Sequence, residues 1–441
     1  MSLDPRAALE RGAMRPLQVM VVALCIAMNA LDGFDVLAIS FAAPGIAKEW
    51  GIDPATLGIV LSMELFGMAA GSVLIGNAAD RMGRRPTILG CLAVMAAGMF
   101  GAAFANNVET LLALRLVTGI GIGGMLSSTS AMVAEFSNAR RRSLNVALNI
   151  AGYSTGAILG GLVASGLLAD GGDWRSVFLF GGAMTAVMLP LALLMPESLD
   201  SLIVRRPPGA LKKINATLGR LRIPSVERLP PQADVTHKPS IMSLFGPRYA
   251  RITIQLTIAY FAQIMLFYYV QKWVPKIVVD MGFAPDQAAH VLVAANIGNL
   301  LGALLIAFST QRVPLRPLIA ASMVAGFIAI GIFGQGFTDI NHLALSVAVA
   351  AFFVNASVVG LYPVLAQTYP STLRASGIGF VIGVGRGGSA LGPVIAGALF
   401  AGGSSLMLVS IMMGIGALVA AAMILTLPMT GGGGAGREKS A

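Results

Sequence analysis

The stretch NALDGFD, residues 29–35, places the acids Asp32 and Asp35 in the middle of an apolar run. That run extends from Leu17 to Phe41, and a helix needs about 20 residues to cross a bilayer. An ionised Asp near the bilayer centre costs roughly 2.5 to 3.5 kcal/mol, so two of them require a polar environment inside the protein. Their i, i+3 spacing puts both on one helix face. The stretch therefore predicts a membrane helix whose acidic face turns toward a polar interior shared with other helices.

Composition extends this interpretation to the whole chain. Of 441 residues, 56% are hydrophobic and only 11% are charged, whereas a soluble chain carries about a quarter charged residues. The net charge of +10 would suit a nucleic-acid-binding protein, but the basic residues lie in short segments between apolar runs. Such placement is typical of topology signals. We therefore expect the lipid bilayer, and no nucleic acid, as a partner.

Hydropathy predicts twelve spans of about the length of one crossing. The predicted spans are 17–41, 56–77, 87–105, 110–135, 143–169, 174–195, 252–275, 287–309, 314–336, 342–366, 373–401 and 403–427. Without alternating polarity, only helices satisfy the backbone in lipid. The expected fold class is an all-α integral membrane protein with twelve transmembrane helices in two pseudo-symmetric six-helix bundles. Lys and Arg concentrate in the segments that place both termini in the cytoplasm.

A long polar insert separates the first six spans from the last six. We expect an N-terminal bundle over 1–195, a cytoplasmic linker over 196–249, a C-terminal bundle over 250–430 and a disordered Gly-rich tail over 431–441. Within the linker, apolar residues of 211–221 fall on one helical face. This pattern predicts either a short amphipathic helix on the inner membrane surface or a solvated linker.

An internal repeat supports the division into halves. A shift of 232 residues aligns Glu135 with Gln367 and Arg142 with Arg374, and it aligns glycines of span five with glycines of span eleven. Repeated halves with polar residues at mid-depth are the architecture of secondary transporters, whose binding site lies between the halves.

The chain offers little material for other chemistry. Cys25 and Cys91 lie in apolar runs, and the three histidines are scattered, so we expect free thiols, no metal site and no catalytic group. A nucleotide-binding G-x4-G-K-[ST] motif is absent from the sequence. We expect no cofactor and no enzyme activity.

The loop between the second and third spans reads GNAADRMGRR over 76–85. Gly83 permits a tight turn, and Asp80 can accept hydrogen bonds from basic groups or from a helix N-terminus. This loop resembles the signature G-x3-D-R-x-G-R-R of the major facilitator superfamily, and the match is complete. Arg115 begins a segment similar to that superfamily's R-x3-G element, and residues 196–198 resemble its P-E-[ST] element.

Two further motifs resemble the aromatic acid:proton symporter family of that superfamily. They are DGFD at 32–35, and RASG at 374–377 followed by GRGG at 385–388. The resemblance implies import of an aromatic carboxylate. The loop at 309–316 departs from the superfamily pattern because it lacks the acid and the glycines of the repeated signature. Ala157 stands where drug antiporters of the superfamily place a proline, which weakens an export interpretation.

Three acids are candidates for proton coupling: Asp32, Asp35 and Glu64. Burial disfavours the charged form of a carboxylic acid, and a second acid nearby disfavours it further. Either aspartate could instead be a structural carboxylate, held by a helix cap or by Arg115. Glu64 is either a second proton site or a partner of Arg115.

Arg115 and Arg386 are the basic residues that we place inside spans. A buried guanidinium stays charged and matches a carboxylate with two parallel hydrogen bonds. Either arginine could hold the substrate carboxylate or neutralise Asp32 and Asp35. We favour Arg386 for the substrate and Arg115 for an internal ion pair.

Aromatic and amide side chains form a stripe along span seven. Rings stack on a flat substrate while amides bind its substituents, but the same side chains also serve packing between helices. The candidates are Tyr260, Gln263, Phe267 and Gln271, with Tyr268, Tyr269 and Lys272 nearby, and more weakly Asn296, Asn299, Asn355 and Tyr362.

Charged residues at the inner ends of spans are candidates for a cytoplasmic gate. We expect their contacts to close the cytoplasmic side in the outward-facing state and to break as the halves rock. A network present in one conformation alone can bias the equilibrium by a few kcal/mol. The gate candidates are Asp80, Arg84, Arg85, Glu135, Arg142 and Arg374.

These features together predict a secondary transporter that imports a hydroxybenzoate-like aromatic carboxylic acid with protons by alternating access. We expect it to act as a monomer in a bacterial inner membrane. Alternatives are a symporter of another organic anion or sugar acid, a ligand-binding membrane sensor without transport and, more remotely, an integral-membrane enzyme.

Overall fold

The computed structural model describes residues 5–10, 12–229, 241–247, 249–309 and 313–428. All regular structure within these ranges is helical, and twelve helices are long and apolar enough to cross a membrane. The predicted all-α fold class is therefore confirmed. The predicted tail at 431–441, together with residues 230–240 of the linker, lies outside the described residues.

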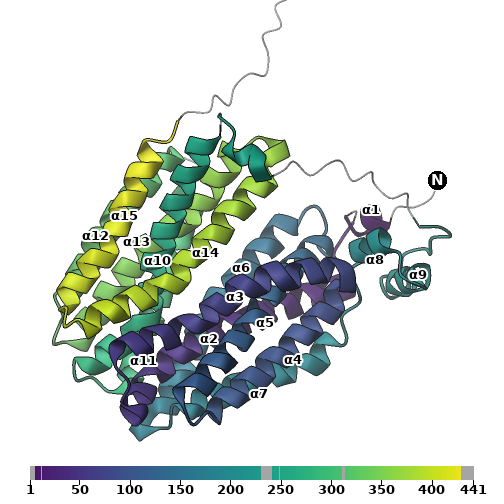
Figure 1. Ribbon diagram of the computed structural model, residues 1–441. Coiled ribbons are helices and arrows are strands. Elements are labelled where there is room, and N and C mark those ends of the chain that lie inside the picture. The colour runs from purple at the N-terminus through teal and green to yellow at the C-terminus, as the bar shows by residue number, and fades with distance from the viewer. Residues whose placement is uncertain (1–4, 11, 230–240, 248, 310–312, 429–441) are drawn as a thin grey trace, which may run out of the picture.

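The twelve spans are arranged in two bundles (Figure 1). The first bundle contains α2 (Pro16–Trp50), α3 (Pro54–Met82), α4 (Arg84–Ala103), α5 (Val108–Glu135), α6 (Arg142–Leu168) and α7 (Arg175–Ala192). The second contains α10 (Ala250–Asp280), α11 (Pro285–Ser309), α12 (Leu315–Gly334), α13 (Ile340–Thr368), α14 (Ser371–Ala401) and α15 (Leu406–Leu425). The helices α3 and α5 pack as α11 and α13 do, and α2 and α6 pack as α10 and α14 do. This correspondence confirms the two pseudo-symmetric halves.

The remaining elements are short and lie outside the spans. They are α1 (Pro5–Glu10), the turn η1 (Ala169–Gly171), α8 (Leu199–Arg205), α9 (Ala210–Arg220) and the turn η2 (Ile241–Phe245). We call the end of the protein that carries α1, α8 and α9 the linker side, and the opposite end the far side.

Polar caps begin several spans on the far side. Asp53 accepts a hydrogen bond from the backbone N–H of Thr56 at the start of α3, and Asn107 caps α5 in the same way. The bond from Thr56 also holds the pKa of Asp53 below its ordinary value, so this cap is ionised at neutral pH. Caps of this kind satisfy backbone donors that a helix start leaves unpaired.

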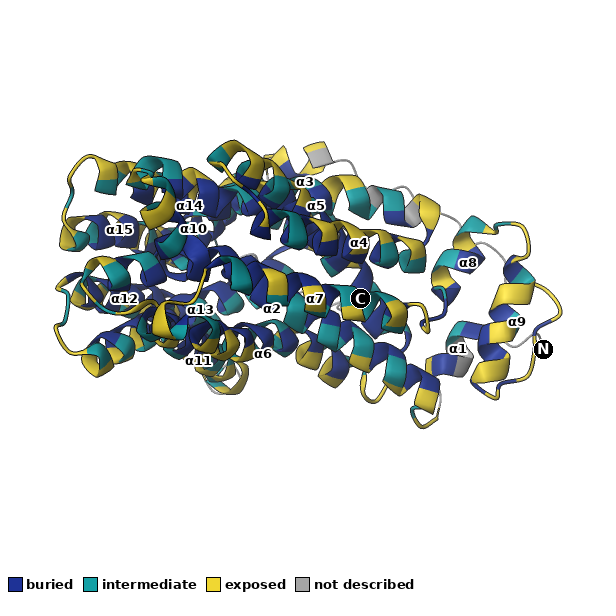
Figure 2. Cartoon of the chain, turned by 90° about the horizontal axis from the view of Figure 1, so that it is seen from below, coloured by how far each residue is buried: buried dark blue, intermediate teal, exposed yellow. Residues whose placement is uncertain are grey.

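The outer surface of the spans is apolar. Exposed residues follow the outer faces of both bundles in Figure 2, and they include large aliphatic side chains such as Leu74, Ile150, Leu345 and Leu425. A soluble protein would bury such residues, so this surface suits contact with lipid.

Small residues bring α2 and α6 into close contact. A Cβ atom at Gly156 would lie 1.8 Å from the carbonyl oxygen of Ala30, and one at Gly33 would lie 2.0 Å from the carbonyl oxygen of Tyr153. Glycine therefore allows the two backbones to touch, as small residues commonly do between membrane helices. This contact sets the position of the segment that carries Asp32.

Replacing Gly156 with Ala is expected to lower the stability by about 1–3 kcal/mol, because the added methyl group forces the two backbones apart. Gly166→Ala is the matched control on the same helix, since nothing lies within 4 Å of its Cβ position. Thermal unfolding of the purified variants in detergent measures both effects. Equal transition temperatures for the two variants would contradict this account of the α2–α6 contact.

The two bundles meet on the far side and part toward the linker side. A Cβ atom at Gly397 of α14 would lie 2.5 Å from the carbonyl oxygen of Pro54, at the start of α3. Ser165 of α6 donates to the carbonyl oxygen of Asp286 of α11 over 3.0 Å. Nearer the linker side, Gly379 and Gly383 of α14 have nothing within 4 Å of their Cβ positions. Figure 1 shows the bundles spreading apart in this direction.

The predicted amphipathic segment of the linker forms helix α9. Its apolar side chains Ile214 and Leu218 are buried within the protein, in one cluster with Leu202 of α8. Asn215 both donates to and accepts from the backbone of Val226, which holds the following loop against the helix. Because the protein covers this apolar face, α9 does not need the membrane surface to bury it.

Candidate functional site

The three candidate acids lie together at mid-depth in the first bundle, where it faces the second. Asp32 and Asp35 come from α2 and Glu64 comes from α3, and all three are buried, with Asp32 only 2% exposed. Thr185 of α7 donates to Asp35 Oδ2 over 3.4 Å. Neither carboxylate oxygen of Asp32 has a hydrogen-bond partner among the described residues. We call Asp32, Asp35 and Glu64 the acidic cluster.

Arg115 of α5 reaches the acidic cluster from within the same bundle. Its guanidinium forms an ion pair with Glu64 and donates to the backbone carbonyl of Asp35 over 3.0 Å. The ring of Phe178 lies against it, with the guanidinium carbon 5.4 Å from the ring centroid. Both side chains of the ion pair are fully buried. Arg115 is therefore occupied by an internal ion pair whose partner is Glu64.

A further base, Lys272, lies inside the spans, so the expectation that Arg115 and Arg386 are the basic residues there is wrong. Lys272 of α10 is fully buried, its Nζ lies 3.5 Å from Glu64 Oε2, and it donates to the carbonyl oxygen of Val36. Lys272 falls within the predicted span 252–275, and helix α10 continues past it to Asp280. Its contact with Glu64 places it at the level of the acidic cluster.

Arg386 of α14 lies apart from the acids, within a group of aromatic residues. It is half-buried, and its Nη1 donates to the carbonyl oxygen of Met68 of α3 over 3.5 Å. Its charge acts on the hydroxyl of Tyr260, which lies 3.2 Å from the hydroxyl of Tyr362. The ring of Tyr260 packs where a Cβ atom of Gly385 would lie. The structure thus brings together Arg386, Tyr260 and Tyr362, three of the predicted substrate residues.

Tyr153 and Tyr268 connect this aromatic group to the acidic cluster. Their side chains lie close to each other between α6 and α10, and both lie near Glu64. Phe267 packs edge-on against Tyr268, with ring centroids 5.2 Å apart. Sequence reasoning missed Tyr153, for which the signal was a polar aromatic residue in the glycine-rich face of α6.

The amide candidates hold α10, α11 and α13 together. Gln271 donates to Asn296 Oδ1 over 3.0 Å, and Asn299 donates to Gln271 Oε1 over 3.3 Å. Asn355 donates to the backbone carbonyl of Asn299 over 2.6 Å, and Gln263 donates to a backbone carbonyl of α13 over 3.1 Å. These are the interhelical contacts of the packing alternative.

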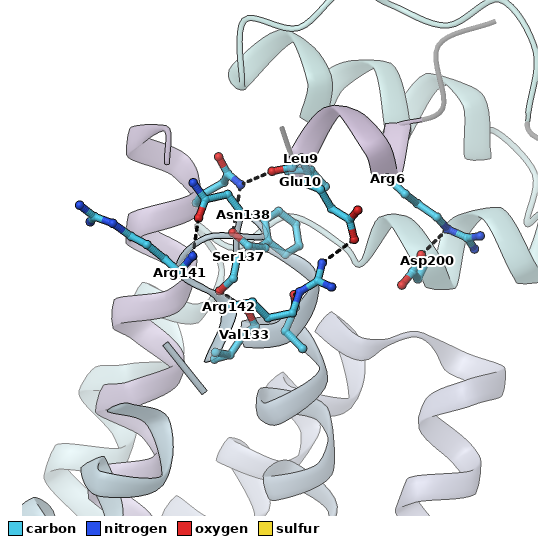
Figure 3. Close-up of polar contacts among 12 residues, drawn as sticks. Arg6, Leu9, Glu10, Val133, Ser137, Asn138, Arg141, Arg142 and Asp200 are labelled. Atoms are coloured by element: carbon cyan, nitrogen blue, oxygen red, sulfur yellow. Dashed lines mark hydrogen bonds and ion pairs between the residues drawn. The ribbon is translucent and has the colours of Figure 1, made fainter. Parts of the chain in front are cut away.

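Two gate candidates join the first bundle to α1 and α8 on the linker side. Ser198 donates to Glu135 Oε2 over 2.6 Å, and Arg142 forms an ion pair with Glu10 over 2.6 Å. Figure 3 shows the ion pair of Arg142 beside that of Arg6 with Asp200. These contacts tie the N-terminal segment and the linker to the corner between α5 and α6.

The signature loop contacts the segment after α7. The backbone N–H groups of Arg84 and Arg85 donate to Glu197 Oε1 over 2.8 and 3.2 Å, and Arg85 Nη2 donates to the carbonyl of Leu193 over 2.6 Å. Arg374 is exposed at the start of α14. The side chain of Asp80 lies outside the described part of the structure, so its predicted contacts are not described. A gating role for these residues stays a prediction.

Comparison with known proteins identifies the class. The profile of the Major Facilitator Superfamily matches residues 24–284. The gallate transporter of Pseudomonas putida is 32% identical to this chain, and the matched region covers 92% of this chain and 91% of that transporter. The 4-hydroxybenzoate transporter PcaK of Acinetobacter baylyi is 31% identical, with coverage of 96% and 94%. A partially occluded inward open structure of the xylose transporter XylE from E. coli has the same fold, with a TM-score of 0.72 and 19% identity over 95% of this chain and all of its own.

The chain therefore belongs to the major facilitator superfamily and is a multi-pass membrane protein. Within that superfamily, its relatives named for gallate and 4-hydroxybenzoate confirm the resemblance to aromatic acid:proton symporters. The candidate site is the charged and aromatic region between the two bundles.

Proposed function

We propose that this protein imports an aromatic carboxylic acid together with protons across a bacterial inner membrane. One observation carries the proposal: a buried acidic cluster and three basic side chains meet aromatic residues at the interface of two repeated bundles. The aromatic acids named for the relatives give the substrate class.

The charges of the site explain why anion and proton would travel together. With every group ionised, Asp32, Asp35 and Glu64 contribute three negative charges, and Arg115, Lys272 and Arg386 contribute three positive charges. A bound carboxylate adds one negative charge, and one proton on the acidic cluster removes it. Because uncompensated charge in a buried site is costly, substrate and proton stabilise each other's binding.

Arg386 is the substrate candidate among the three bases. Arg115 is occupied by Glu64, and Lys272 contacts both Glu64 and the backbone of α2. Arg386 is half-buried beside the hydroxyl groups of two tyrosines, where it can form two parallel hydrogen bonds with a carboxylate while the rings contact an aromatic substrate.

The two bundles part toward the linker side, and this direction of opening supports an inward-facing state. Basic residues cluster on the linker side, among them Arg84, Arg85 and Arg140–Arg142, and such residues stay in the cytoplasm. The linker side would then be cytoplasmic, and the bundles part toward it. Rocking of the bundles about their far-side contacts would supply alternating access.

Uptake into proteoliposomes tests the function. Labelled 4-hydroxybenzoate is expected to accumulate when the outside is more acidic than the inside, and to equilibrate without accumulation when the pH values are equal. A set of benzoates, aliphatic acids and sugar acids tests the substrate class. Accumulation of aliphatic or sugar acids alone would favour a different anion symporter, and saturable binding without entry would favour a sensor.

Arg386→Lys is expected to weaken binding of 4-hydroxybenzoate about tenfold, because lysine keeps the charge but loses the paired geometry of the guanidinium. Arg374→Lys is the matched control, since Arg374 lies on the same helix and is exposed. Isothermal titration of the purified proteins measures both dissociation constants. Unchanged affinity of Arg386→Lys would remove Arg386 from the substrate site.

A further inference from the structure

Lys272 crosses the interface between the bundles. It belongs to α10 of the second bundle, yet its Nζ lies 3.5 Å from Glu64 Oε2 and donates to the carbonyl of Val36, both in the first bundle. Its side chain is entirely buried. The neighbouring amide on α10 instead binds the second bundle, since Gln271 donates to Asn296.

The negative charge around Lys272 makes its contact with the first bundle sensitive to proton binding. Within the first bundle, the fully ionised acidic cluster and Arg115 together have two net negative charges, from three acids and one base. A cation held at this position is attracted by both charges in a region of low dielectric. A proton on any member of the acidic cluster removes one of the two charges and weakens the attraction.

We propose that Lys272 is the coupling residue through which the charge of the acidic cluster holds the two bundles together. This inference rests on the proposed function, since it states how proton binding would change the conformation. With the acids ionised, Lys272 binds the second bundle to α2 and α3. A proton on the cluster releases that hold, and the bundles become free to rock.

The charged groups that act on Lys272 are Glu64 of α3, with which it pairs, and Arg115 of α5. Asp32 and Asp35 of α2, Tyr153 of α6 and Tyr268 of α10 lie near Glu64. Arg386 lies on α14, which packs against α10. Tyrosine stays neutral near physiological pH, with an ordinary pKa of about 10. The tyrosines therefore keep their charge state, and we assign the change of charge to the acidic cluster.

A cross-link between the bundles measures how firmly Lys272 holds them together, and it needs no substrate. A Cβ atom at Gly161 of α6 would lie 2.5 Å from Val293 Cγ2 of α11, so the pair Gly161→Cys/Val293→Cys can form a disulfide while the bundles touch on the far side. The natural cysteines Cys25 and Cys91 are buried and free. The rate of disulfide formation with an added oxidant is compared at one pH, so that thiol chemistry is the same in every variant.

Lys272→Gln and Glu64→Gln are each expected to slow the cross-link about tenfold, and the double variant is expected to be no slower than either, because both remove the same interaction. Lys272→Arg is expected to retain most of the rate. Lys276→Gln is the matched control, since Lys276 lies one turn along α10 and pairs with Asp280 at the surface. A Lys272→Gln variant that cross-links at the unsubstituted rate, or effects that multiply in the double variant, would overturn the proposal.

Folding and transport have separate readouts. If Lys272→Gln does not fold, the comparison is made in Lys272→Gln/Asp32→Asn, which has the same net charge as the unsubstituted cluster and is expected to fold and to cross-link slowly. In vesicles, Lys272→Gln is expected to continue to exchange labelled for unlabelled 4-hydroxybenzoate, while accumulation falls about tenfold per unit of pH gradient. A raised KM with full accumulation would overturn the proposal and assign Lys272 to the substrate. Failure of the unsubstituted protein to take up 4-hydroxybenzoate would contradict the proposed function but leave the cross-linking result valid.

Discussion

Asp32→Asn is expected to abolish accumulation of substrate against its gradient while exchange of labelled for unlabelled substrate continues. Both oxygens of Asp32 lack hydrogen-bond partners among the described residues, so an amide of the same shape removes the charge and the proton site without breaking a contact. Each unit of pH gradient supports about tenfold accumulation per coupled proton, because one unit corresponds to about 1.36 kcal/mol. The variant should lose that factor.

The experiment compares two kinds of flux in the same vesicles. Accumulation is measured with an acidic exterior, and exchange is measured with equal pH on both sides. Asp53→Asn is the matched control, because Asp53 caps α3 on the far side and Asn caps a helix start equally well. Full accumulation by Asp32→Asn would exclude Asp32 as a coupling site and would direct attention to Asp35 or Glu64.

Arg115→Met is expected to reduce the free energy of unfolding by ~3–5 kcal/mol, which is the usual cost of removing one partner of a buried ion pair. In this variant, Lys272 is the basic partner of Glu64 that remains among the described contacts. The backbone carbonyl of Asp35 also loses the hydrogen bond from the guanidinium. The buried site would then hold an uncompensated charge.

The double variant Arg115→Met/Glu64→Gln is expected to recover much of the lost stability, since it removes both charges of the pair. Arg175→Met is a contrast: this arginine pairs with Glu49 through two bonds of 2.7 Å, but both side chains are partly exposed on the far side. Solvent screening limits its contribution to about 1 kcal/mol or less. Chemical or thermal unfolding in detergent ranks the variants, and an Arg115→Met protein as stable as Arg175→Met would refute the assignment of Arg115 to a buried structural pair.

The polar contacts at the centre of the molecule divide into two kinds. The amides of Gln263, Gln271 and Asn299 bond to neighbouring helices of their own bundle, and they hold that bundle rigid. Lys272 and Arg386 instead reach groups of the other bundle. A transporter that rocks two rigid bodies needs both kinds, and the contacts that cross the interface are the ones that its cargo and protons can alter.

Much of the fold was predictable because membrane spans are a local property. A run such as Leu17–Phe41 is apolar in any context, and lipid leaves the backbone no alternative to a helix. The cost of placing a charge in lipid likewise marks Asp32 and Asp35 as unusual from the sequence alone. The motif at 76–85 added the superfamily.

Partners were not predictable in the same way, because they depend on how helices pack. Arg115 pairs with Glu64 of α3 and not with the aspartate carboxylates, and the amide stripe of α10 turns largely toward α11 and α13. Tyr153 joins the site because glycines such as Gly156 let α6 approach α2. No periodicity within one helix contains that information.

The sequence by itself determined that the acids Asp32, Asp35 and Glu64 enter the membrane and require compensation, since the energy of a charge in lipid depends on little beyond its depth. The tertiary structure alone decided which base meets which acid, and that Lys272 meets Glu64 across the two bundles. The physical reason is that the length of an apolar run depends on consecutive residues of one helix. An ion pair, in contrast, forms only where two helices bring their side chains within about 4 Å of each other.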